Sequence, residues 1–169
     1  MPGRVDRKGL GARLRRIRLV LLDVDGVMTD GGLYYTAEGM ELKRFNAQDG
    51  YGIVRARESG LTMGIISGRS TPVVEARARA LNIEDVIQGA DDKVAAMQSI
   101  RTKYGFEERE VAFIGDDLFD IPLLRRVGFA AAPRNARPEV KRVVHYVTRA
   151  SGGDGAVREM IDVIIGRKT

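Results

Sequence analysis

The stretch that most constrains the fold runs from Leu19 to Asp30 and reads Leu-Val-Leu-Leu-Asp-Val-Asp-Gly-Val-Met-Thr-Asp. Four consecutive apolar residues, closed off by charged residues and glycine, are typical of a buried parallel strand. Two carboxylates, Asp23 and Asp25, follow at once, and ionised carboxylates are costly to bury without a cation or hydrogen-bond donors. Ligands bind at the carboxyl ends of strands in open α/β sheets. We therefore expect Asp23 and Asp25 to hold a metal ion and to take part in chemistry.

The length and composition of the chain limit the classes of protein that need to be considered. Its 169 residues suit one domain with a sizeable core. No apolar run approaches the roughly 18 residues of a membrane span, so no membrane partner is expected. The absence of cysteine excludes disulfides and thiolate metal sites and fits a cytoplasmic location. A single histidine, His145, excludes zinc sites built from several histidines.

The basic charge is concentrated at the N-terminus. The net charge is +5, and residues 1–18 hold seven Lys and Arg side chains against one acidic side chain. This pattern predicts a basic, flexible leader over residues 1–16 and a folded domain over residues 17–169. Contact of the leader with RNA or another anionic surface is an alternative. A nucleic-acid partner is not favoured, because no aromatic residue is interleaved with the basic ones.

Strand-like and helix-like patterns alternate along the rest of the chain. Strands are predicted over residues 19–22, 61–66, 85–88, 110–114, 129–132 and 145–148, and helices over 49–58, 72–81, 93–104, 119–127, 138–144 and 156–165. Residues 31–45 predict a β-hairpin around Ala37-Glu38-Gly39. The expected fold is a doubly wound, mostly parallel, Rossmann-like α/β sheet with this hairpin inserted.

Reactive or polar side chains follow several of the predicted strands. In chain order they are Asp23, Asp25, Ser67, Lys93, Asp116, Asp117 and Asp120. Because parallel strands bring their carboxyl ends to one edge, these groups are expected to converge, and together they suit phosphoryl transfer. One carboxylate attacks phosphorus and another handles protons. Mg²⁺ and a hydroxyl–ammonium pair neutralise the phosphoryl oxygens. Taken singly, each residue also fits a turn, a helix cap or a solvated side chain.

The order of these segments resembles the haloacid dehalogenase superfamily of phosphohydrolases, over residues 18–166. The resemblance implies that Asp23 is the nucleophile and a Mg²⁺ ligand. It implies that Asp25 is the general acid and base and touches the metal through its backbone carbonyl, and that Asp116 is the third ligand. It also implies that Ser67 and Lys93 hold the phosphoryl group and that Asp117 and Asp120 orient the site.

The segment between the motif at Asp23–Asp30 and the motif that contains Ser67 narrows the resemblance to one subgroup of the superfamily. Only the hairpin and one helix lie there, which leaves no room for a cap domain. Residues 31–35, 41–46, 49–50, 67–69 and 152–159 look like those of the capless 3-deoxy-D-manno-octulosonate (KDO) 8-phosphate phosphatases, which act in lipopolysaccharide core sugar biosynthesis. The resemblance implies a phosphorylated sugar acid as substrate, bound by Asp25, Lys43 and Arg69. It also implies a homotetramer, in which the hairpins form a central barrel and a glycine-rich C-terminal tail closes a neighbour's active site.

Other interpretations stay open at this point. Nonulosonate 9-phosphate phosphatases share the capless core, but they tend to have an acidic residue where this chain has Arg69. Gln48 stands where some relatives have arginine, so one substrate contact is expected to differ. A phosphatase of nucleic-acid ends and a non-catalytic tetramerising or regulatory module are further alternatives. The intact set of acidic residues favours an enzyme over a module.

Overall fold

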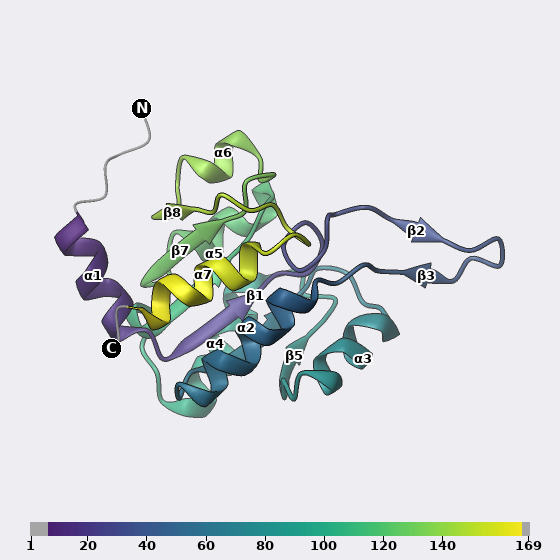
Figure 1. The fold of residues 1–169 in the computed structure, drawn as a ribbon. Helices are drawn as coiled ribbons and strands as arrows, with labels where there is room; N and C mark the ends of the chain where they lie inside the picture. Colours follow the sequence, from purple (N-terminus) through teal and green to yellow (C-terminus); the bar gives the residue numbers. More distant parts are fainter. Residues whose placement is uncertain (1–6, 167–169) are drawn as a thin grey trace.

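The structure is a computed structural model that describes residues 7–166 (Figure 1). Six parallel strands form the main sheet, in the order β5-β4-β1-β6-β7-β8. They are β1 (Leu19–Leu22), β4 (Thr62–Ile66), β5 (Asp85–Ile87), β6 (Val111–Ile114), β7 (Phe129–Ala132) and β8 (Tyr146–Val147). The predicted doubly wound sheet is confirmed, and β1, the strand that leads into Asp23, lies between β4 and β6.

Helices cover both faces of the sheet. Val20 and Leu22 of β1 belong to the core cluster that includes α2 (Ala47–Glu58), α3 (Pro72–Ala80) and α7 (Ala156–Ile165). Leu19 and Leu21 belong to the opposite cluster, with α4 (Lys93–Tyr104), α5 (Ile121–Leu124) and α6 (Pro138–Lys141). Because successive side chains of a strand point to opposite faces, a strand buried on both sides must be apolar throughout. The continuous apolar run of β1 has this cause.

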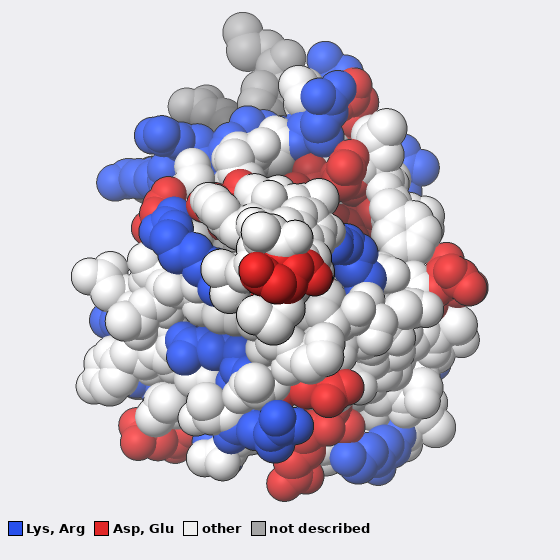
Figure 2. Space-filling view, turned by 90° about the vertical axis from the view of Figure 1, so that its right-hand side faces the viewer, with Lys and Arg blue, Asp and Glu red and all other residues white. Residues whose placement is uncertain are grey.

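The predicted hairpin is present and projects beyond the sheet (Figure 1). It consists of β2 (Tyr34–Tyr35) and β3 (Glu41–Leu42), with Tyr34 opposite Leu42 and Tyr35 opposite Glu41. Figure 2 looks onto its tip, where an acidic group lies among uncharged surface and basic side chains lie to the sides. The hairpin region exposes large apolar side chains between 45% and 62%: Leu33, Tyr34, Tyr35, Met40 and Leu42.

A helix, α1 (Arg7–Arg16), occupies most of the predicted flexible leader. Leu14, near its end, is fully buried, as is Ile17 just after it, and the Arg13 guanidinium donates a hydrogen bond to the Gly128 carbonyl at 3.2 Å. The spacing of Leu10, Leu14 and Ile17 is helical, a signal that the charge-based prediction overlooked. For residues 7–16 the structure therefore replaces the expected leader by a packed helix, and residues 1–6 lie outside the described part.

Helix ends differ from the predictions where side-chain caps decide them. Helix α2 begins at Ala47 rather than at the predicted Asp49. The Asn46 side chain caps it by accepting hydrogen bonds from the backbone N–H groups of Gln48 and Asp49. Asp92 caps α4 in the same way. The helices expected over 119–127 and 138–144 shrink to the four-residue α5 and α6. Within residues 7–166, every helix is too short or too polar to cross a membrane.

Candidate active site

A pocket of about 290 Å³ lies at the carboxyl ends of the central strands. All seven residues that the sequence assigned to phosphoryl chemistry line it, together with Arg69: Asp23, Asp25, Ser67, Lys93, Asp116, Asp117 and Asp120. The structure therefore brings together the groups that the strand-end argument expected to converge. Lys43 does not line this pocket, and Gln48 is exposed at the start of α2.

Three carboxylates form the floor of the pocket around one ammonium group. Asp23, Asp116 and Asp120 each place a carboxylate oxygen within 4.8 Å of the others. Lys93 lies 2.9 Å from Asp23 and 2.6 Å from Asp120, with its side chain only 4% exposed. Burial lowers the pKa of Lys93, but the neighbouring charges of Asp23 and Asp120 outweigh it and the pKa is raised. Lys93 therefore stays cationic, and one positive charge faces three carboxylates.

The excess of negative charge perturbs two of these carboxyl groups strongly. Burial, followed by repulsion from Asp120, raises the pKa of Asp23 to about 7 against the opposing pull of Lys93. Burial, followed by repulsion from Asp23, raises the pKa of Asp116 to about 8. Such a cluster of oxygen ligands with uncompensated negative charge suits a divalent cation such as Mg²⁺. The residues present therefore fit the metal that the sequence analysis expected.

The hydrogen bonds indicate which carboxylates are available as ligands. One oxygen of Asp120 accepts from Lys93, and the other accepts from the backbone N–H groups of Asp116 at 2.9 Å and Asp117 at 3.2 Å. Both oxygens of Asp120 are thus already engaged, and this residue fixes the loop rather than offering itself to a cation. Asp117 accepts a hydrogen bond from the Leu118 backbone N–H and caps η2 (Leu118–Asp120).

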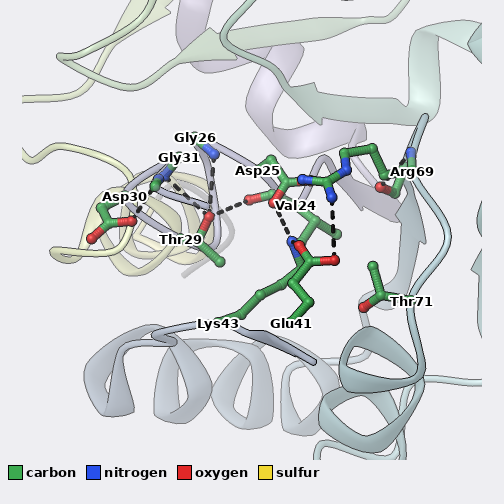
Figure 3. Close-up of polar contacts among 12 residues, drawn as sticks. Val24, Asp25, Gly26, Thr29, Asp30, Gly31, Glu41, Lys43, Arg69 and Thr71 are labelled. Atoms are coloured by element: carbon green, nitrogen blue, oxygen red, sulfur yellow. Dashed lines mark hydrogen bonds and ion pairs between the residues drawn. The ribbon is translucent and has the colours of Figure 1, made fainter. Parts of the chain in front are cut away.

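The loop after β1 is held by Thr29, which the sequence analysis did not single out (Figure 3). The buried hydroxyl of Thr29 accepts hydrogen bonds from the backbone N–H groups of Gly26 at 3.3 Å and Gly31 at 3.2 Å. The first of these bonds fixes the peptide that carries the Asp25 carbonyl. Gly26 has φ +83°, and a Cβ there would lie 2.1 Å from a carboxylate oxygen of Asp116. Only glycine allows this close approach of the two loops.

A second clamp joins the same loop to the glycine-rich segment. The Asn135 side chain donates to the Gly26 carbonyl at 3.0 Å and accepts from the Gly152 backbone N–H at 2.7 Å. Gly153 donates its backbone N–H to the Val27 carbonyl at 3.1 Å. The glycine-rich turn is therefore buried against the loop of its own chain, and α7 behind it is part of the core. Asn135 was missed because only its place after β7, at the same sheet edge, marks it in the sequence.

The hairpin adds a polar network at the rim of the pocket (Figure 3). Lys43 contacts the carboxylates of both Asp25 and Glu41. The other Glu41 oxygen accepts from Arg69 at 3.2 Å, and Arg69 also donates to the Tyr35 hydroxyl at 3.1 Å. The predicted substrate-binding residues Asp25, Lys43 and Arg69 are thus close together, and Glu41, which the sequence analysis did not single out, joins them. Ser67, at the end of β4, is 2% exposed and accepts from the Arg69 backbone N–H at 3.3 Å.

Comparison with known proteins supports the same assignment. Residues 81–161 match the family described as haloacid dehalogenase-like hydrolase. The chain is 44% identical over 153 residues to 3-deoxy-D-manno-octulosonate 8-phosphate phosphatase of Yersinia pestis. The aligned residues are 90% of this chain and 82% of that protein. The crystal structure of the Yersinia pestis phosphatase has a TM-score of 0.93 at 42% identity, covering 95% of this chain and 86% of that one.

A further solved structure carries ligands. It is the 3-deoxy-D-manno-octulosonate 8-phosphate phosphatase of Moraxella catarrhalis in complex with magnesium ion, phosphate ion and KDO. It has a TM-score of 0.93 at 38% identity and covers 96% of this chain and 93% of that chain. From the pocket, the fold and an identity of 44% along 90% of the sequence, we conclude that this chain belongs to the haloacid dehalogenase-like hydrolases, in the family of the KDO 8-phosphate phosphatases.

Proposed function

We propose that this chain is a Mg²⁺-dependent phosphatase that hydrolyses KDO 8-phosphate to KDO and phosphate, in lipopolysaccharide core sugar biosynthesis. The observation that carries the proposal is the pocket that joins Asp23, Asp25 and Asp116 with Lys93, in a fold that matches a relative solved with magnesium, phosphate and KDO. The phosphate is expected to bind over the carboxylate floor, and the sugar acid to extend toward the hairpin and Arg69.

The residues divide the reaction between two carboxyl groups. Asp23 attacks phosphorus, and the bond from phosphorus to the sugar oxygen breaks as Asp25 gives its proton to that oxygen. Water then attacks the phosphorus of the aspartyl-phosphate, Asp25 takes a proton from the water, and the Asp23 carboxylate and inorganic phosphate are released. Ser67 and Lys93 hold the phosphoryl oxygens during both steps.

The metal has a defined place in this scheme. Asp23 and Asp116 would hold it with carboxylate oxygens and Asp25 with its backbone carbonyl, while Asp117 and Asp120 keep the surrounding loop in position. When bound, Mg²⁺ supplies neutralising charge to the attacking carboxylate and the phosphoryl oxygens. The Thr29 hydrogen bond to the Gly26 N–H holds the Asp25 carbonyl in a fixed orientation.

We further propose that the enzyme is a cytoplasmic homotetramer in which neighbouring subunits complete the active sites. The apolar side chains exposed on the hairpin support the oligomer, since a two-stranded hairpin is marginally stable alone. Leu118 and Phe119, half exposed beside the pocket, are available to a neighbouring subunit. Nucleic acid and membranes are not expected partners.

The experiment is phosphate release with Mg²⁺ from a panel of esters. It contains KDO 8-phosphate, two nonulosonate 9-phosphates, simple sugar phosphates and a 3′-phosphorylated oligonucleotide, with Asp23→Asn as the inactive control. A strong preference for KDO 8-phosphate is the expected result. Preference for a nonulosonate ester or the oligonucleotide would overturn the substrate and keep the reaction. Failure of the wild-type enzyme on every ester, with Mg²⁺ bound, would indicate a regulatory module instead.

A further inference from the structure

The hairpin sends one side chain deep into the rim of the active site. Lys43 has its side chain only 1% exposed, and its ammonium group contacts the carboxylates of Asp25 and Glu41, the latter at 2.8 Å. Figure 3 shows this ammonium enclosed by the two carboxylates. A lysine held in this way has no free face to offer a substrate, although its charge is close to the reacting groups.

The strand geometry explains why these side chains meet. Tyr35 lies opposite Glu41 in the hairpin register, and Lys43 follows Glu41 by two residues, so all three emerge on the same face. That face contacts Asp25 and Arg69, whereas Leu42, between Glu41 and Lys43, is 55% exposed. The hairpin is thus fixed to the active site through its polar face.

Asp25 depends on this contact. Within residues 7–166, Lys43 is the only side chain that hydrogen-bonds to the Asp25 carboxylate, which is 23% exposed toward the pocket. Lys43 engages one carboxylate oxygen and leaves the other for a reacting proton. Burial lowers the pKa of Lys43, but its hydrogen bonds to Asp25 and Glu41 outweigh burial and raise that pKa.

We infer that Lys43 is a positioning residue for the acid–base carboxylate of Asp25 rather than a ligand of the substrate, and that Glu41 positions Lys43. This inference rests on the proposed phosphatase function, because it deepens the part that Asp25 plays there. It gives Lys43 a different role from the one that the family resemblance implies. Arg69 differs from Lys43, because its side chain is 39% exposed. Arg69 therefore stays available for the carboxylate of the sugar acid.

The two roles for Lys43 predict different kinetics. A sugar alkoxide is a poor leaving group and needs a proton from Asp25, whereas p-nitrophenolate leaves without one. A loss of Asp25 positioning should therefore lower kcat/KM for sugar phosphates and spare p-nitrophenyl phosphate. Hydrolysis of the aspartyl-phosphate needs Asp25 as base with either ester. A burst of p-nitrophenolate close to one per site should then precede slow turnover.

The test compares Lys43→Met, Glu41→Gln and Lys43→Arg with the wild-type enzyme on three esters: KDO 8-phosphate, a sugar phosphate without a carboxylate, and p-nitrophenyl phosphate. For Lys43→Met we expect kcat/KM to fall about 10-fold to 100-fold on both sugar phosphates, a part of the roughly 10²-fold to 10⁴-fold that general acid–base catalysis contributes. On p-nitrophenyl phosphate it should change by less than about 3-fold. Glu41→Gln should show a smaller fall with the same pattern, and Lys43→Arg should restore part of the loss. Lys103→Met is the matched control, because Lys103 is bound to Asp85 outside the pocket.

Each other outcome contradicts the inference. A rise in KM confined to KDO 8-phosphate would make Lys43 a ligand of the substrate carboxylate. An equal fall on all three esters, or no change, would remove a special link to Asp25. A wrong substrate assignment can be told apart from a wrong role for Lys43. If KDO 8-phosphate is not the substrate, the wild-type enzyme will prefer another sugar phosphate. The contrast between sugar phosphates and p-nitrophenyl phosphate would still report on Lys43.

Discussion

At the scale of single residues, the carboxyl groups of the proposed metal ligands Asp23 and Asp116 would link metal binding to pH. Their pKa values of about 7 and about 8 lie above the ordinary value of 3.8. Between pH 4 and pH 8 the metal-free folded chain therefore keeps protons that the unfolded chain has released. The stability that these protons contribute is fully present below about pH 4 and is lost as the pH rises through about 7 to 8. Once these protons are lost, a bound cation compensates the negative charges of the two carboxylates in their place.

We therefore expect Mg²⁺ to raise the melting temperature more at pH 8 than at pH 5. The measurement is a set of thermal melts between these pH values, each with EDTA and with Mg²⁺. The difference between the two melts is the quantity to compare, because His145, whose pKa burial lowers, contributes an opposite pH trend to both. Asp116→Asn should remove most of the Mg²⁺-dependent rise. A rise that is equal at pH 5 and pH 8 would contradict the linkage.

The residues of the site differ in how far the sequence predicted them. Asp23, Ser67, Lys93 and Asp116 each follow an apolar run or begin a helix, so parallel topology alone was enough to predict that they converge. Thr29, Glu41 and Asn135 could not be predicted in this way, because their partners depend on how a hairpin and two loops settle against one another. Those non-local contacts leave no periodic pattern in the sequence.

At the scale of elements, the turn before α7 supports the loop after β1. A Cβ at Gly152 would lie 1.9 Å from the Gly26 carbonyl oxygen, and Asn135 bridges the same two backbones. The sequence predicted the bounds of α4 and α7 correctly, since their caps and apolar spacing are local. It did not predict that the glycine-rich turn packs against the loop after β1, because a run of glycines looks the same whether it is mobile or tightly packed.

We predict that Gly152→Ala lowers both stability and Mg²⁺ affinity. The added methyl group must push the loop that holds Asp25 and Gly26, and overpacking of this kind costs about 1 to 3 kcal/mol. Thermal melts and direct calorimetric titration with Mg²⁺ measure the two effects. Gly9→Ala is the matched control, because Gly9 in α1, like Gly152, does not have a positive φ, and nothing lies within 4 Å of its Cβ position. A Gly152→Ala enzyme that binds Mg²⁺ as tightly as the wild type would show that the turn does not position the loop.

At the scale of the whole molecule, one hairpin serves two purposes on its two faces. Its inner face carries Glu41 and Lys43 to the active site, and its outer side exposes Met40 and Leu42 at 62% and 55%. If the outer side is covered by neighbouring subunits, assembly fixes the same strand that holds Asp25. Oligomerisation and catalysis would then be coupled through β3.

We expect the double variant Met40→Ser, Leu42→Ser to break the tetramer and to lose activity on KDO 8-phosphate. Sedimentation at micromolar concentration should show a tetramer for the wild type and a smaller species for the variant. The lost activity should follow the pattern of Lys43→Met, with p-nitrophenyl phosphate spared in kcat/KM, because a loose hairpin releases Asp25 in the same way. Val147→Ser, an exposed apolar position on β8, is the control and should keep the tetramer. A wild-type monomer would contradict the assembly, and a dissociated variant with full activity would separate it from catalysis.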